Sequence, residues 1–129
     1  MSSESLHAPR ERLSTETFSL HHAIVSLMEE LDAVDWYRQR ADDCEDGALR
    51  DILLHNMREE MEHAAMVLEW IRRNNADFSG HLKTYLFAEG PILEVEKAVT
   101  ASEARGQSAR SSSSPRTRED FTIGPLRKD

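Results

Sequence analysis

The chain has 129 residues, a formal net charge of −8 and a single cysteine, Cys44. This length suits one small domain, with or without a tail. One cysteine excludes an internal disulfide framework, a cysteine-based zinc site and a rubredoxin-type iron site within one chain. No run approaches the roughly 20 apolar residues that cross a bilayer, and the first residues lack the apolar segment of a secretory signal. We therefore expect a cytoplasmic protein without a membrane anchor.

The negative charge is concentrated in the first hundred residues. Residues 1–100 hold 20 acidic and 10 basic side chains, whereas residues 101–129 hold 4 acidic and 6 basic ones. Such an acidic region disfavours nucleic acid as a partner and is compatible with attracting cations. A solvated acidic surface explains the same charge more simply.

Residues 1–12 show no periodicity, and we expect them to be disordered. Ser14 or Thr15 can cap a helix that continues to about Ala41 without Gly or Pro. The acidic residues and the glycine of segment 42–47 then predict a turn.

A second uninterrupted helix is predicted over residues 48–73, with Asn74-Asn75 supplying a left-handed end. A shorter helical piece is expected between residues 78 and 99. Gly90-Pro91 interrupts it, because proline lacks an N–H and restricts the residue before it.

Each predicted long helix carries two stripes at alternating steps of three and four residues, the spacing of helix-packing faces. One stripe is apolar, and its neighbour has a polar centre, which is Glu30 in the first helix and Glu60 with His63 in the second. A two-helix hairpin cannot cover faces this wide. We therefore expect two chains to pair into a four-helix bundle.

These polar centres match half of a known type of metal site. Diiron carboxylate bundles use a Glu from each of two helices and a Glu-x-x-His from each of the other two. One chain supplies Glu30 and the pair Glu60–His63, and a two-fold dimer would supply the rest. A buried Glu–His ion pair that fixes the register of the dimer explains the same residues. Spacing alone leaves both interpretations open.

The segments HHAIVSLMEELDAVDWYRQR, HNMREEMEHAAMVLEWIRRN and HLKTYLFAEGPI resemble the encapsulated ferritin family over about residues 16–95. The resemblance implies an all-α fold within residues 13–99: an antiparallel two-helix hairpin plus a short C-terminal helix, dimerising into a ferritin-like four-helix bundle. It implies a ferroxidase that oxidises Fe²⁺ at a diiron centre across the dimer interface. Dimers would assemble into a ring-shaped decamer inside an encapsulin nanocompartment, for iron storage and detoxification.

The resemblance also implies roles for individual residues. The ferroxidase residues of the family match Glu30, Glu60, His63 and Tyr37. A site where metal ions enter maps onto Glu29, Asp32 and Trp36, and Ca²⁺ is a further candidate ion there. Asp32 stands where the family is expected to have Glu, which shortens the reach of that carboxylate by one methylene.

The last part of the chain changes in composition. Residues 100–120 are rich in Ser and Arg and have no large aliphatic side chain, which predicts a flexible linker. Residues 121–129, FTIGPLRKD, resemble encapsulin cargo-loading peptides and imply the shell protein as a partner. A frayed tail with three chance apolar residues is the alternative.

Two other functions remain open. A helical dimer could hold Zn²⁺ or Mn²⁺ without turnover, because Zn²⁺ generally binds such donors more tightly than Fe²⁺. A purely structural cargo adaptor could use the Glu–His pair for register alone. Aerobic oxidation of Fe²⁺ separates a ferroxidase from both.

Overall fold

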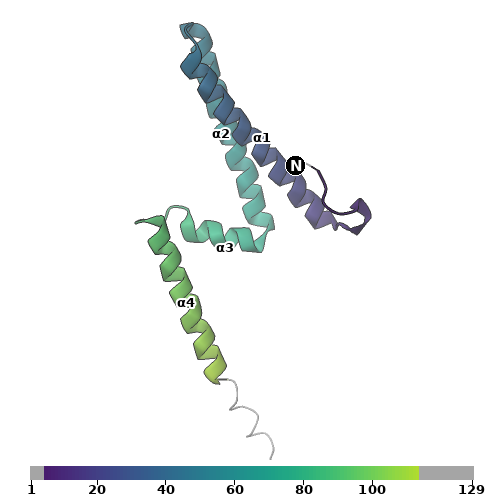
Figure 1. Ribbon diagram of the computed structural model, residues 1–129, viewed down its shortest axis with the longest axis vertical. Coiled ribbons are helices and arrows are strands. Elements are labelled where there is room, and N and C mark those ends of the chain that lie inside the picture. The colour runs from purple at the N-terminus through teal and green to yellow at the C-terminus, as the bar shows by residue number, and fades with distance from the viewer. Residues whose placement is uncertain (1–4, 114–129) are drawn as a thin grey trace, which may run out of the picture. The chain divides into compact units, whose positions relative to one another are not determined.

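A computed structural model describes the backbone of residues 5–113 and the side chains of residues 5–108. This part of the chain is entirely helical, which confirms the all-α prediction (Figure 1). The elements are η1 (Arg10–Arg12), α1 (Thr15–Asp43), α2 (Gly47–Asn74), α3 (Ala76–Tyr85) and α4 (Ile92–Ser113). The chain forms two compact units that divide between Lys83 and Thr84. No helix in the described range is long and apolar enough to cross a membrane.

α1 and α2 form a long hairpin, side by side in Figure 1. The Ser14 hydroxyl accepts a hydrogen bond from the Thr17 N–H at 3.1 Å and caps α1, as the sequence predicts. The Asp46 carboxylate accepts one from the Leu49 N–H at 3.0 Å and caps α2. Each cap satisfies a backbone donor that the first turn of a helix leaves without a partner.

The end of α2 differs from the prediction. Asn75 has φ −139° and ψ 111°, so the backbone there is extended rather than left-handed. Its side-chain oxygen accepts a hydrogen bond from the Phe78 N–H at 2.8 Å. Asparagine favours this capping position because its short amide reaches the backbone two or three residues on. Asn75 therefore starts α3 instead of closing α2.

Two expected disordered or flexible segments contain helix. Residues 10–12 form the 3₁₀ turn η1, and the Arg10 guanidinium carbon lies 4.9 Å from the centre of the Phe18 ring. α4 continues to Ser113, so residues 100–113 of the expected linker are helical. The Ala, Glu, Arg and Gln residues of this stretch favour helix even though they cannot fill a core. The rest of the linker and the peptide at 121–129 lie outside the described residues.

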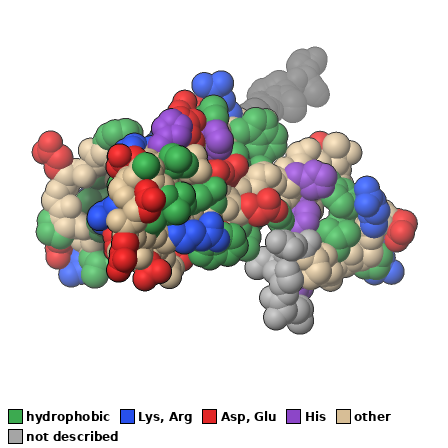
Figure 2. All heavy atoms as spheres, turned by 90° about the horizontal axis from the view of Figure 1, so that it is seen from above, with side chains coloured by type: hydrophobic (Ala, Val, Ile, Leu, Met, Phe, Trp, Pro, Cys, Tyr) green, Lys and Arg blue, Asp and Glu red, His purple; other side chains and the backbone are tan. Residues whose placement is uncertain are grey.

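The described chain has almost no buried core of its own. Ala41, Ala64 and Ile71 are its only buried hydrophobic residues. Large hydrophobic side chains such as Leu31 (53% exposed) and Met61 (47% exposed) remain open to solvent, and Figure 2 shows many of them on the surface. A helix pair alone thus covers its predicted packing faces only in part.

Candidate metal centre

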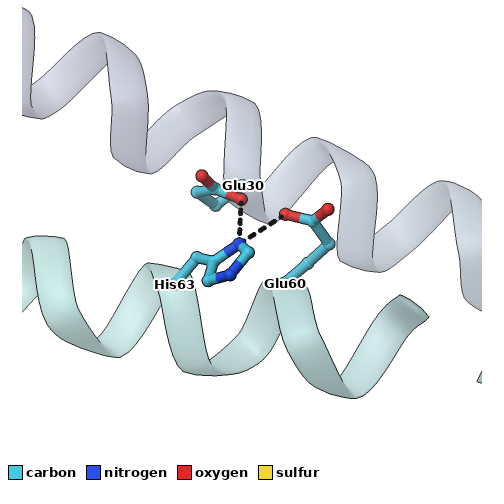
Figure 3. Close-up of side chains that lie close together, drawn as sticks. All are labelled: Glu30, Glu60 and His63. Carbon is cyan, nitrogen blue, oxygen red and sulfur yellow. Dashed lines mark ion pairs between the residues drawn. The ribbon is translucent and has the colours of Figure 1, made fainter. Parts of the chain in front are cut away.

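Three side chains of the hairpin converge from two helices (Figure 3). Glu30 comes from α1, and Glu60 and His63 lie one turn apart on α2. His63 Nδ1 is 3.6 Å from Glu30 Oε2 and 3.4 Å from Glu60 Oε2. One donor atom from each residue lies within 4.8 Å of the others. The structure brings these three predicted residues together, and we refer to them as the ligand cluster.

The ligand cluster is open on one side. The side chains of Glu30 and Glu60 are 25% and 24% exposed, and that of His63 is 41% exposed. None of the three is therefore sealed inside the hairpin. The cluster can be reached by an ion, and it can be covered by another protein surface.

The two carboxyl groups shift each other's pKa in opposite directions. Hydrogen bonding to Glu60, together with partial burial, raises the pKa of Glu30. Hydrogen bonding to Glu30 lowers the pKa of Glu60. Opposite shifts of this kind arise because two close carboxylates repel when both are ionised. A cation placed between them would relieve that repulsion.

His63 favours its charged form in this arrangement. Partial burial lowers the pKa of His63, but hydrogen bonding to Glu60 and the charges of both carboxylates outweigh it and raise the pKa. An imidazolium at this position offsets part of the negative charge of the two carboxylates. A metal ion would displace that proton, since it binds neutral imidazole.

The donor set suits a divalent transition metal. Carboxylate oxygen and imidazole nitrogen are ligands for iron, zinc and manganese. Among residues 5–108 the ligand cluster is the sole group of three acidic, His or Cys side chains with donor atoms this close. One chain offers three donors, fewer than two metal ions require, so it presents an incomplete site for a pair of ions.

The other predicted site residues are not members of the ligand cluster. Tyr37 is half-buried and lies seven residues beyond Glu30 on α1, about 10 Å along the helix axis. The Arg40 guanidinium carbon is 5.5 Å from the centre of the Tyr37 ring, a neighbour that our sequence analysis missed although the i, i+3 spacing indicates it. The residues of the expected entrance, Glu29, Asp32 and Trp36, are exposed on α1.

A second cluster of charged side chains, on α2, was also missed. Glu69 binds Arg72 through contacts of 2.6 and 2.8 Å and Arg73 through one of 2.6 Å. These hydrogen bonds, led by the one to Arg72, lower the pKa of Glu69 to about 2. Arg72 also reaches the Ser79 hydroxyl of α3 at 3.5 Å. We refer to Glu69, Arg72 and Arg73 as the Glu69 cluster.

Comparison with known proteins decides the family. The model of the EncFtn-like family matches residues 5–89, which include α1, α2 and α3. The chain belongs to the EncFtn-like family. It is 52% identical to the "Encapsulated ferritin-like protein" of Rhodospirillum rubrum, over 98% of this chain and 90% of that protein. This confirms the resemblance found in the sequence.

Two further proteins are similar to this chain. The chain is 46% identical to the "Ferritin-like protein" of Thermotoga maritima, over 73% of this chain and 82% of that one. A crystal structure of a Nitrosomonas europaea protein is 53% identical and superimposes with a TM-score of 0.66. It covers 68% of this chain and 97% of its own. The aligned part of this EncFtn-like chain therefore corresponds to nearly the whole length of the Nitrosomonas europaea protein chain.

Proposed function

We propose that this chain is a ferroxidase whose active site is completed by a second copy. The observation that carries the proposal is the ligand cluster, which gathers two carboxylates and one imidazole at the half-exposed surface of a hairpin. Two copies related by a two-fold axis would contribute four Glu and two His, the set used by ferritin-like diiron proteins. The pairing also covers apolar side chains that one chain leaves exposed.

The reaction transfers one electron from each iron ion to the oxidant. With oxygen as oxidant, four Fe²⁺ and one O₂ take up four protons and give four Fe³⁺ and two waters. Glu30 and Glu60 would hold and bridge the two ions, and His63 would bind each ion at its outer side. Fe²⁺ is the substrate of this reaction, and the second copy is the partner that completes its site.

The other predicted residues have supporting roles in this proposal. Tyr37 lies on the same helix as Glu30, and we assign it a role in iron oxidation near the ligand cluster. Glu29 and Asp32 attract metal ions at the entrance, which lies next to Trp36. Ca²⁺ is a further ion that would bind at this entrance. The exposure of these three side chains supports that role.

The proposal extends to the setting of the protein. A close relative is named as an encapsulated ferritin-like protein, which supports a role in iron storage and detoxification inside an encapsulin compartment in the cytoplasm. Residues 121–129 would bind the shell protein. Dimers would assemble into a larger ring, a decamer in the form that the sequence resemblance implies.

The test is aerobic oxidation of Fe²⁺, followed by ferric absorbance. Glu60→Ala and His63→Ala should each slow oxidation by more than about 100-fold, because even the loss of an outer-shell partner costs about 10–100-fold at a metal site. Glu16→Ala and His81→Ala remove the same chemical groups from exposed positions and should keep the wild-type rate. An undiminished rate in Glu60→Ala would falsify the ligand assignment.

The same experiment separates the alternatives. A dimer that holds Zn²⁺ or Mn²⁺ without turnover binds metal through the same residues but produces no catalytic ferric absorbance. A structural cargo adaptor neither binds metal at the ligand cluster nor oxidises iron, and metal analysis of the purified protein identifies it.

A further inference from the structure

His63 presents one ring nitrogen to the ligand cluster and turns the other away from it. Nδ1 lies 3.6 Å from Glu30 Oε2 and 3.4 Å from Glu60 Oε2, and Figure 3 shows Nε2 on the far side of the ring from both contacts. A metal ion held between the two carboxylates would therefore bind Nδ1. Neutral imidazole carries one proton, which then stays on Nε2 and needs a hydrogen-bond acceptor.

The helix offers His63 two acidic neighbours on the turn before it. A helical side chain leans towards the N-terminus and reaches the residues three and four positions earlier. For His63 these residues are Glu60 and Glu59. Glu60 belongs to the ligand cluster and faces Nδ1, so Glu59 is the carboxylate of that turn that remains for Nε2.

Glu59 has only a weak partner of its own. Its Oε1 lies 3.7 Å from Nε2 of His55, which is one turn further towards the start of α2, and the two side chains are 50% and 66% exposed. This distance is longer than a hydrogen bond, and exposed ion pairs contribute little to stability. Exposed side chains also change rotamer quickly, on the picosecond to nanosecond timescale. Glu59 can therefore leave His55 for His63 at little cost.

The charge of Glu59 already acts on the His63 ring. Partial burial has the largest effect on the pKa of His63 and lowers it, whereas Glu60, Glu30 and Glu59 each raise it. Of these three carboxylates, Glu59 is the one outside the ligand cluster. It is thus close enough to influence the imidazole without being a candidate ligand.

We propose that Glu59 is a positioning residue for His63: its carboxylate accepts a hydrogen bond from Nε2–H when Nδ1 binds a metal ion. Metal-bound histidines almost always donate their second N–H to a group of this kind, which fixes the ring and makes it a stronger ligand. Glu59 itself touches neither the ion nor the oxidant. This role rests on metal binding by the ligand cluster, as in the proposed function, and does not depend on iron oxidation.

The Zn²⁺ affinity of the full chain, measured by competition with a chromophoric chelator, tests this role. Glu59→Ala should weaken binding by about 10–100-fold, the usual loss when such a partner is removed. Glu59→Gln keeps an acceptor oxygen and should lose less. The matched control is Glu62→Ala, which removes the same charge from an exposed residue directly before His63. Adjacent residues of a helix do not face each other, so this variant should bind as wild type.

Nuclear magnetic resonance of the Zn²⁺-loaded chain with nitrogen-15-labelled histidine provides a second readout. In the wild type we expect zinc on Nδ1 of His63 and a proton on Nε2 that exchanges slowly with water. Glu59→Ala should make that proton exchange faster, whereas Glu62→Ala should leave its exchange unchanged. A merely structural contribution of Glu59 to α2 would alter the helical circular dichroism and not this single proton.

Three results would each overturn the role of Glu59: unchanged Zn²⁺ affinity in Glu59→Ala, an equal loss in Glu62→Ala, or zinc bound to Nε2 of His63. Oxidation of Fe²⁺ by the wild type judges the ferroxidase proposal separately. An active wild type with unchanged affinity in Glu59→Ala keeps the ferroxidase and removes the role of Glu59. An inactive wild type whose affinity falls in Glu59→Ala does the reverse, and a wild type that binds no zinc overturns the role of Glu59.

Discussion

Two charged clusters lie nine residues apart on α2, and they use their carboxylates in opposite ways. Glu69 is saturated by two guanidinium groups at 2.6–2.8 Å, and its pKa falls to about 2. Glu60 faces a second carboxylate from α1 and one histidine at 3.4 Å. The first cluster contains its own cations, whereas the second has more negative charge than its histidine offsets. This excess, rather than the presence of acidic residues, distinguishes a candidate metal site from a structural ion pair.

A cationic side chain introduced into the ligand cluster should neutralise its excess negative charge, as Arg72 and Arg73 do for Glu69. In Glu30→Arg, a guanidinium takes the place of the metal ion beside Glu60. We expect the affinity for Co²⁺, measured by absorbance titration, to fall by more than about 100-fold, since loss of even an outer-shell partner costs about 10–100-fold. Glu16→Arg makes the same charge change at an exposed position of α1 and should bind as wild type. Retained affinity in Glu30→Arg would show that the ions bind elsewhere.

Metal should stabilise the fold through the ligand cluster alone. At a free Zn²⁺ concentration of about 100 times Kd, binding to the folded state adds about 2.7 kcal/mol to the free energy of unfolding. Thermal denaturation with Zn²⁺ and with a chelator measures this increment. His63→Ala should lose it, and Glu69→Gln should keep it. An equal increment in His63→Ala would contradict the assignment.

Glu69 should matter for stability rather than for metal. Because its pKa in the folded state lies below the ordinary value of 4.5, its contribution is fully present above pH 4.5. It is lost as the pH falls from 4.5 towards 2. Glu69→Gln should therefore lower Tm by a few degrees at pH 7 and by progressively less towards pH 2, as thermal scans would show. A pH-independent difference would mean that the loss comes from packing.

An exposed ion pair provides the lower limit of the comparison. Arg38 Nε lies 3.8 Å from Asp42 Oδ1 on α1, and both side chains are about 60% exposed. Pairs of this kind contribute about 0–1 kcal/mol. Asp42→Asn should leave Tm, metal affinity and iron oxidation within experimental error of wild type. A substantial change in any of the three would show that spacing and charge alone do not rank these clusters.

The hairpin and the ligand cluster could be predicted from the sequence because both follow from helical period. Alternating steps of three and four placed Glu30 on one helix face and Glu60 with His63 on the other, and the structure brings these faces together. The caps at Ser14 and Asp46 are hydrogen bonds between residues three apart in the sequence. Such local bonds can be predicted from a short stretch of sequence.

Other features of the fold and the site could not be predicted from helical period alone. Asn75 can either close one helix or cap the next. In the structure its side chain caps the start of α3. α4 extends past the expected limit because low apolar content excludes a core but not a helix. The entrance residues Glu29, Asp32 and Trp36 share one exposed helix, so their role stays a prediction.

Counting iron on the paired chain tests the central claim most directly. Native mass spectrometry after anaerobic addition of Fe²⁺ should find two ions on each dimer and none retained on the monomer, with both ions lost in Glu60→Ala. Monomers that bind iron and oxidise it rapidly on exposure to air would contradict the claim that one chain holds only half of the site.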